Sequence, residues 1–351
     1  MKKVFYMHKL SAIGGVESFL YYLSKIYNDF IVYYKEADAE QVKRLAQNVE
    51  VHKYTKPIEC DMFFCNYGYD IEVNAKEFKK NIIHYDPLNV GFTPMVNDEF
   101  SYIGVSKVAC NGFKAKTGND CELIYNVIPI EKPNVKKKKG LNLISATRLT
   151  SEKGGDRINK LARLLDNAGI EYTWDIYTNR VNYKFVSPNI KVHQQKLDLT
   201  KEIAEASYLV QLSDCESFGL SVCESLILGT PVIITPLEAF KEIGCIHGVN
   251  AVICDFSMKQ VDLDMIKQNS LKFDYKPPKS DWGKYLTNKG TYNKDELVEV
   301  RTLRRVWLIE ENLHCLRNQV IKLKRARASE LEAKGYVEVL WVGVIIGEKM
   351  K

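Results

Sequence analysis

The chain has 351 residues, of which 46% are hydrophobic and 27% are charged, and its net charge is +6. This length suits two domains with an appendage rather than one core, and the composition excludes an intrinsically disordered chain and a fibrous repeat. Nine cysteines, an odd number spread over both halves, favour free thiols in a reducing compartment over a disulfide framework, so we expect a cytoplasmic protein.

The first part of the chain alternates short apolar runs with polar stretches, as the strands of a mostly parallel α/β sheet do. Residues 4–8 predict a first strand, and the chain shows no signal peptide before them. A loop with Gly14 and Gly15 follows, and apolar residues at helical spacing then predict a helix that reaches Ile26. We interpret residues 1–131 as a Rossmann-like domain. Its further predicted strands are 31–34, 62–64, 82–84 and 102–105.

Residues 132–140 include a proline and a run of four lysines, which is typical of a linker, although a solvated loop within one domain has the same composition. The α/β pattern then restarts with a predicted strand at 141–146, a Gly-Gly loop and a helix at 158–168. We interpret residues 141–290 as a second doubly wound domain. Its further predicted strands are 174–177, 190–193, 208–212 and 231–234.

Residues 291–351 differ from both domains and predict a small, basic, β-rich module. Between Arg301 and Arg327 eight lysines or arginines stand against two glutamates, a net charge of 8 − 2 = +6. The longest apolar run, 336–346, contains a glutamate and is far shorter than the roughly 20 residues of a spanning helix. We expect no transmembrane span, which leaves peripheral membrane contact open. Because aromatic residues are sparse among the basic ones, a solvated or partner-docking surface is favoured over nucleic acid.

The segment 213–236, SDCESFGLSVCESLILGTPVIITP, carries the most chemical information. It predicts a strand end, a loop that holds Glu216, and a helix from about Gly219 with Glu224 one to two turns inside. A carboxylate at the carboxyl edge of a sheet, beside the free N–H groups of a helix start, can bind sugar hydroxyls and an anion together. Taken singly, the two glutamates equally fit a charge at a helix N-terminus and a solvated helix residue.

A second cluster, 145–155, places Arg148 and Lys153 five residues apart on a glycine loop that precedes a helix. Two such cations can hold a pyrophosphate, and the helix N-terminus adds N–H donors. The cluster therefore predicts a diphosphate site, although either cation alone would be an ordinary surface charge.

The order Glu-Ser-Phe-Gly-Leu at 216–220, Glu224 and Gly-Thr-Pro-Val-Ile at 229–233 resembles the Glu-x7-Glu motif of family 4 retaining glycosyltransferases. The resemblance implies the GT-B fold, in which two Rossmann-like domains, an acceptor-side and a nucleotide-sugar-binding one, face a cleft. In such enzymes the first glutamate lies against the hexose and the second holds the ribose. The implied donor-binding residues are Gly14, Gly15, Arg148, Lys153, Glu216, Ser217, Phe218, Gly219, Leu220 and Glu224. The implied catalytic residues are Glu216, His84, Arg148 and Lys153.

His84, at a predicted strand end, resembles the family histidine near the sugar and acceptor, and a histidine with a purely structural role fits equally well. Asn126 resembles the asparagine before the linker, and we assign it a turn role. The Asp-x-Asp run at 262–264 matches a metal-binding motif of another glycosyltransferase class. It follows the nucleotide-binding elements, so we interpret it as a solvated surface feature.

The resemblance implies a metal-independent transfer of a hexose, with retention of configuration, from a nucleotide-diphosphate sugar such as a UDP-sugar to a glycan, lipid or other small acceptor. It implies no cofactor beyond this co-substrate. Two alternatives remain: a non-enzymatic nucleotide-sugar or glycan-binding protein of the same fold, and a DNA-modifying sugar transferase. The sequence does not specify the base, the sugar, the acceptor or the oligomeric state.

Overall fold

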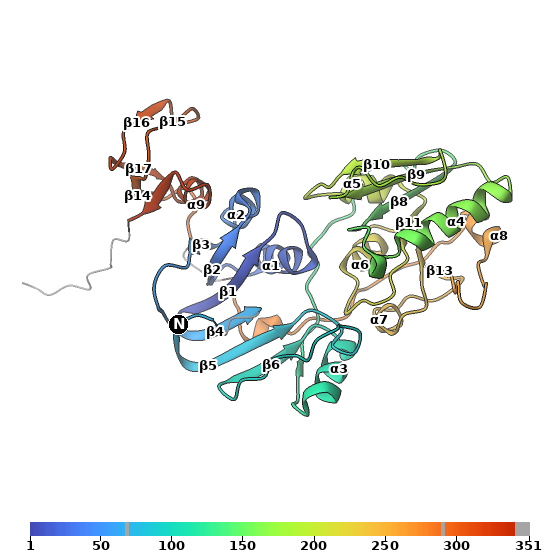
Figure 1. Cartoon of the computed structure of the whole chain (residues 1–351), viewed down its shortest axis with the longest axis horizontal. Helices are drawn as coiled ribbons and strands as arrows, with labels where there is room; N and C mark the ends of the chain where they lie inside the picture. Colours follow the sequence, from blue (N-terminus) through green and yellow to red (C-terminus); the bar gives the residue numbers. More distant parts are fainter. Residues whose placement is uncertain (67–69, 289–291, 341–351) are drawn as a thin grey trace, which may run out of the picture. The chain divides into compact units, whose positions relative to one another are not determined.

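The computed structural model describes residues 1–66, 70–288 and 292–340 (Figure 1). The chain divides into two compact units. The first contains Met1–Asn81, Glu99–Ser101 and Gly283–Lys351, and the second contains Ile82–Asp98 and Tyr102–Trp282. The predicted apolar run at 336–346 lies outside the described residues from position 341 onward. Of the helices in the described ranges, none is long and apolar enough to cross a bilayer.

Two large parallel sheets dominate the fold, as the alternating apolar runs predicted. The first has the strand order β3-β2-β1-β4-β5-β6-β7, and the second has the order β10-β9-β8-β11-β12-β13. In each sheet the order reverses beside the first strand, between β1 and β4 and between β8 and β11. This is the 3-2-1-4-5-6 arrangement of Rossmann-like domains, so the expected fold class is confirmed.

The first sheet contains every strand predicted between 4 and 105, although β4 extends on both sides of the predicted 62–64 and the helices α2 and α3 were not predicted. Strand β5 begins well before the predicted 82–84. Lysines and other polar residues interrupt the apolar residues in its first part, so only its apolar end was predicted as a strand. The short strands β3 and β7 were not predicted. The elements are β1 (Lys3–Leu10), α1 (Gly15–Ile26), β2 (Phe30–Ala37), α2 (Ala39–Leu45), β3 (Glu50–Lys53), β4 (Ile58–Asn66), β5 (Val73–Ile83), β6 (Phe100–Gly104), α3 (Lys107–Thr117) and β7 (Glu122–Leu123).

The second sheet contains every strand predicted between 141 and 234, and one further short strand, β13. The elements are β8 (Leu141–Ala146), η1 (Ser151–Lys153), α4 (Gly155–Asn167), β9 (Tyr172–Thr178), β10 (Ile190–Gln194), α5 (Thr200–Glu205), β11 (Tyr208–Gln211), α6 (Leu220–Ile227), β12 (Val232–Ile234), α7 (Glu238–Glu242), β13 (Ala251–Ile253), α8 (Leu263–Gln268) and η2 (Trp282–Lys284).

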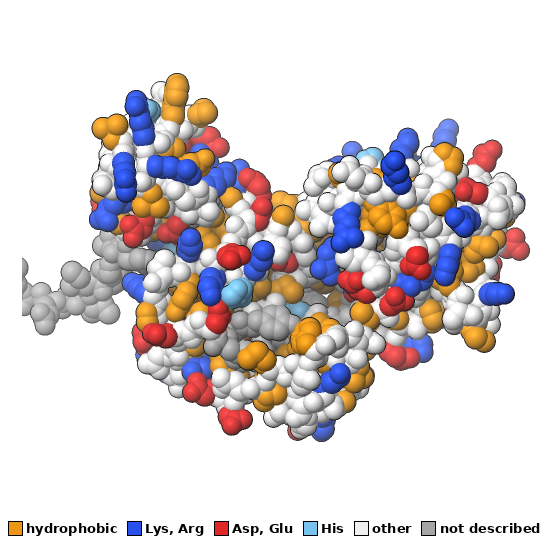
Figure 2. All heavy atoms as spheres, in the orientation of Figure 1, with side chains coloured by type: hydrophobic (Ala, Val, Ile, Leu, Met, Phe, Trp, Pro, Cys, Tyr) orange, Lys and Arg blue, Asp and Glu red, His pale blue; other side chains and the backbone are white. Residues whose placement is uncertain are grey.

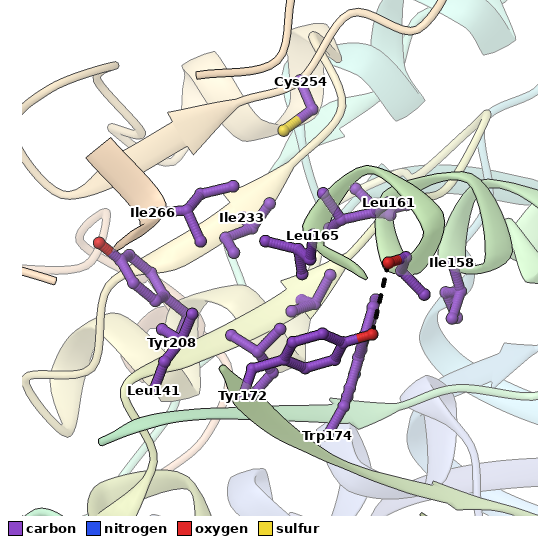
Figure 3. Packing of buried hydrophobic residues seen from close by; sticks show 14 of the residues in the cluster. Leu141, Ile158, Leu161, Leu165, Tyr172, Trp174, Tyr208, Ile233, Cys254 and Ile266 are labelled. Atoms are coloured by element: carbon purple, nitrogen blue, oxygen red, sulfur yellow. Dashed lines mark hydrogen bonds between the residues drawn. The ribbon is translucent and has the colours of Figure 1, made fainter. Parts of the chain in front are cut away.

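The core of the second unit packs α4 onto this sheet (Figure 3). Trp174 is fully buried, and its Nε1 donates to Ser145 Oγ at 3.0 Å. The Ser145 hydroxyl in turn donates to the Val210 carbonyl at 2.8 Å. Tyr172 donates to the Ala162 carbonyl of α4, the dashed line in Figure 3. These bonds satisfy buried polar groups and tie β8, β9 and β11 together, so the strands that carry the site loops are held firmly.

The predicted β-rich appendage is present as a three-stranded antiparallel sheet, β17-β14-β18, with a hairpin and one helix. It belongs to the first unit, where α9 packs beside α2 and β3 (Figure 1). Ser329 donates to the Val51 carbonyl at 3.1 Å, and Arg325 pairs with Glu50 at 3.1 Å. The elements are β14 (Leu297–Thr302), β15 (Val306–Leu308), β16 (Leu313–Cys315), β17 (Val320–Lys324), α9 (Arg325–Ala333) and β18 (Val337–Val339).

Candidate functional site

Two loops leave the carboxyl ends of the neighbouring parallel strands β8 and β11, where the order of the second sheet reverses. Open parallel sheets bind ligands at this point, because the loops on either side diverge and leave room between them. Residues 147–154 form the first loop and residues 212–219 form the second. The amide of Asp214 donates to the Glu152 carbonyl at 2.8 Å, so the two loops are joined directly.

Lys153 and Glu216, one from each loop, form an ion pair of 2.7 Å between Nζ and Oε1. Their side chains retain only 17% and 16% of their exposure, so the pair is partly desolvated yet open to a ligand. Attraction between partly buried charges is stronger than at an open surface. The structure thus pairs the lysine that was predicted to bind the diphosphate with the glutamate that was predicted to bind the sugar.

Glu216 is also held by two buried side chains that the sequence did not single out. Ser213 Oγ donates to Glu216 Oε1 at 2.8 Å, and Gln211 Nε2 donates to the same oxygen at 3.1 Å. Ser213 is fully buried and Gln211 is 5% exposed. Together with Lys153, all three donors contact one carboxylate oxygen, so Oε2 takes no part in this network. The three donors therefore fix the position of the carboxylate through Oε1, and Oε2 accepts none of these three bonds.

Gly154 explains how the two loops approach so closely. Its φ is +81°, and a Cβ there would lie 2.0 Å from the Leu212 carbonyl oxygen, so any side chain would both strain the backbone and clash. Arg157 braces the same contact: its Nε donates to the Leu212 carbonyl at 2.6 Å, and its Nη1 pairs with Asp214 at 2.7 Å. Arg157 was not predicted as a site residue, because its only signal was its place in the first turn after the Gly-Gly pair.

The second loop continues into α6 through Gly219, whose φ of +86° again favours glycine. Phe218 is 2% exposed and anchors the loop, and none of the described side chains caps the start of α6. The Ser217 hydroxyl donates to the His84 carbonyl at 2.7 Å. Leu220 is the first helical residue. The segment 216–220 thus forms a fixed turn from a carboxylate into a helix N-terminus, a geometry suited to polar, anionic ligands.

His84 directly follows β5, at the strand end where the sequence placed it. Its carbonyl meets Ser217, so the second unit brings His84 to the loop that carries Glu216. Burial lowers the pKa of the His84 imidazole to about 3, because the charged form loses its hydration. The ring is therefore neutral near pH 7 and can act as a hydrogen-bonding group rather than as a cation.

Arg148 and Glu224 lie on the same two segments without joining the ion pair described above. Arg148 is exposed on the first loop, where, within the described ranges, it makes no hydrogen bond or ion pair. Glu224 is half-buried on α6. Asn126, after β7, is buried at 4% exposure, and the turn role assigned to it stays a prediction. The structure therefore pairs Lys153 with Glu216 and bonds the His84 carbonyl to the neighbouring Ser217, while Arg148 lies on the first loop and Glu224 on α6.

Gly14 and Gly15 lie in the other compact unit, at the start of α1 after strand β1. A Cβ on Gly14 would lie 2.2 Å from Glu17 Oε2, so the missing side chain makes room for this carboxylate. Glu17 is 6% exposed, and its Oε1 accepts from the Ser11 amide at 2.8 Å. This buried acid ties the loop after β1 back onto α1, and the sequence analysis did not single it out.

The described residues contain no group of three or more His, Cys, Asp or Glu side chains placed to hold a metal ion. Asp262, from the Asp-x-Asp run, is instead the N-cap of α8 and accepts from the Met265 amide at 2.8 Å. This bond gives the first aspartate of the run a structural role. All nine cysteines are free.

The fold defined by these sheets is the GT-B fold of glycosyltransferases. Residues 128–267, which include both site loops, match the family described as "Glycosyl transferases group 1". A comparison with curated proteins finds no match.

Solved structures share the fold at low sequence identity. The HepE protein of Anabaena, solved with UDP and glucose, superposes with a TM-score of 0.56 at 15% identity over 71% of this chain and 84% of that chain. The same protein with UDP-glucose gives 0.57 at 14% identity over 72% and 85%. A glycosyltransferase of Rickettsia africae gives 0.52 at 10% identity over 76% and 93%. At these identities the likeness establishes the fold alone.

Proposed function

We propose that the protein is a glycosyltransferase that moves a hexose from a nucleoside-diphosphate sugar, in the first instance a UDP-sugar, to a glycan, lipid or other small acceptor. The family match over residues 128–267 and the GT-B fold support this reaction class. The proposal includes retention of configuration, as in family 4 enzymes, and a reaction without metal ion. Residues 141–290 form the proposed nucleotide-sugar domain, and 132–140 link it to an acceptor-side domain, 1–131.

The roles follow from the chemistry of glycosyl transfer. Positive charge develops on the sugar ring while negative charge builds on the departing diphosphate. Arg148 and Lys153 stabilise the diphosphate, and preorganised donors of this kind contribute on the order of a few kcal/mol each. Glu216 and the amides of 217–220 bind the hexose hydroxyls, and Glu224 binds the ribose. His84, neutral near pH 7, serves as a hydrogen-bonding group beside the sugar.

One observation carries the proposal: Lys153 and Glu216 lie 2.7 Å apart on two loops at the reversal point of a parallel sheet. A cation for phosphate and a carboxylate for hydroxyls, side by side, match a ligand in which a phosphate is attached directly to a sugar. A site for a simple anion would not place a carboxylate beside the lysine, because the carboxylate would repel the anion.

The test is release of nucleotide from UDP-, GDP- and ADP-sugars, by hydrolysis or by transfer to added acceptors, with products identified by mass spectrometry. We expect one donor to release its nucleoside diphosphate, and Glu216→Gln to abolish the release while the variant still unfolds cooperatively. The anomeric configuration of the product then tests retention, and the rate in excess chelator tests the metal-independent reaction.

A non-enzymatic binding protein of the same fold predicts a different result. Such a protein would be stabilised against thermal unfolding by a nucleotide sugar and would release no nucleotide. Stabilisation without release, across donors and acceptors, would contradict the proposed activity while leaving the binding site in place.

A further inference from the structure

The β15–β16 hairpin of the appended module has one face that points away from the core of the module. Trp307 pairs with His314 across the hairpin, and Val306 pairs with Cys315. Successive residues of a strand point to opposite sides. Leu308 and Cys315 belong to the small core of the module, so Trp307 and His314 project away from it. Arg305, Ile309 and Leu316 lie directly beside the ends of these two strands, and all three are exposed.

This outward hairpin face, defined by Arg305, Trp307, Ile309, His314 and Leu316, is strongly apolar for an exposed surface. Trp307 is 66% exposed, Ile309 is 79% exposed and Leu316 is 60% exposed. Single exposed apolar side chains are ordinary, but three within one short hairpin indicate a surface that is covered by a partner. Figure 2 shows hydrophobic and basic side chains side by side over this module.

The charge around the outward hairpin face is basic on balance, because residues 303–317 contain three arginines, Arg304, Arg305 and Arg317, against Glu310 and Glu311. Arg305 Nε lies 3.2 Å from His314 Nε2, and Arg317 directly follows the exposed Leu316. Three glutamates near the hairpin share the single Arg327 within the described part of the module, so this pairing offsets only part of their negative charge. They are Glu310 at 3.6 Å, Glu311 at 2.9 Å and Glu330 at 2.8 Å. The face therefore presents arginines beside apolar side chains.

We propose that the outward hairpin face docks the protein onto an anionic lipid bilayer. Trp307, Ile309 and Leu316 enter the interfacial layer, and Arg305 and Arg317 contact the lipid headgroups. A tryptophan with arginines would also suit single-stranded nucleic acid, where bases stack on aromatic rings. The exposed Ile309 and Leu316 favour the bilayer over nucleic acid. Burial of aliphatic side chains in lipid lowers the free energy, whereas such side chains make no favourable polar contact with a phosphate backbone. This docking is independent of the transfer reaction proposed above.

The test is co-sedimentation of the full chain with vesicles of phosphatidylcholine alone and of phosphatidylcholine mixed with phosphatidylglycerol. We expect binding to the mixed vesicles only, weakening as salt is raised. Both Trp307→Ser with Ile309→Ser and Arg305→Gln with Arg317→Gln should reduce the partition coefficient by at least about tenfold. The matched control is Met258→Ser with Lys191→Gln, an exposed apolar and an exposed basic residue of the other unit, which should bind normally. All these side chains are exposed, and unchanged thermal unfolding checks that the variants fold.

Three results would overturn the proposal. The first is equal binding of the wild type and both hairpin variants to mixed vesicles. The second is binding that is lost when 341–351, an apolar segment outside the described residues, is removed and unaffected by the hairpin changes. The third is salt-sensitive binding to single-stranded DNA, lost in the arginine variant, by a protein that ignores both kinds of vesicle.

Discussion

Lys153 Nζ lies 2.7 Å from Glu216 Oε1, so the side chain proposed to bind the phosphate and the side chain proposed to bind the sugar neutralise each other's charge. An incoming diphosphate would compete with Glu216 for Lys153. Glu216 would not be left unpaired by that exchange, because Ser213 and Gln211 hold the same oxygen. The buried network therefore lets the lysine turn to the diphosphate while the carboxylate stays in position.

Lys153→Met should lower kcat/KM for the donor by on the order of 100-fold, because it removes a cation from the departing diphosphate. Methionine keeps much of the length and apolar contact of lysine without the charge. The matched control is Lys160→Met, an exposed lysine of α4 outside both loops, which should leave kcat/KM unchanged. The measurement is nucleotide release under steady-state conditions. Near-normal turnover by a folded Lys153→Met variant would remove the diphosphate contact from the mechanism.

Ser213→Ala tests whether the buried network positions Glu216 in the reaction. Loss of a hydrogen bond to a charged group costs about 1.5–3 kcal/mol, so we expect kcat to fall by at least about tenfold. KM should change little if the bond matters most once Lys153 has turned to the diphosphate. Ser270→Ala, at an exposed position, serves as the control. A rise in KM alone, or a loss of thermal stability without a change in kcat, would indicate that Ser213 is merely structural.

The regular elements of the fold were readable from the sequence wherever apolar periodicity is strong. The strand at 141–146 was predicted with the bounds that β8 has, because its apolar residues alternate and a Gly-Gly loop follows. Strand β5 was seen only at its buried end, since residues 73–81 carry lysines and polar groups on a half-exposed strand. β3 and β13 were missed because three or four residues give too short a pattern.

The sequence singled out residues for the candidate site, which stay a prediction, but it did not reveal how their side chains are arranged. Glycine spacing and charge pointed to Lys153 and Glu216, and the parallel topology explains why their loops are neighbours. That the two side chains would pair with each other depends on the close approach at Gly154, which no local pattern reveals. Ser213 and Gln211 carry no motif signal of their own, because their importance arises from contacts across a turn.

Gly154→Ala should destabilise the second unit by more than about 2 kcal/mol, since it combines a left-handed backbone with a clash against the Leu212 carbonyl. The matched control is Gly169→Ala. Its φ of +63° is also left-handed, but a Cβ there meets nothing within 4 Å, so it should cost only the backbone term of about 1 kcal/mol. Urea unfolding of both variants measures the difference. Equal losses would show that the loop contact adjusts without cost.

His84 predicts how stability depends on pH. Burial lowers its pKa to about 3 in the folded protein, whereas an unfolded histidine titrates near 6.5. Between these values the unfolded chain binds a proton that the folded chain does not. The free energy of unfolding should therefore fall as pH drops from about 6.5 toward 3, by at most about 1.4 kcal/mol per pH unit from this group.

Carboxylates titrate over part of the same range, so the contribution of His84 has to be isolated by comparison. His84→Asn removes the titrating ring, and the difference in unfolding free energy between wild type and variant should change between pH 7 and pH 5. Urea unfolding of both proteins at the two pH values measures this difference. A wild type and a His84→Asn variant that lose stability in parallel would mean that the imidazole is hydrated in the folded protein, and its neutral role beside the sugar would then have to be abandoned.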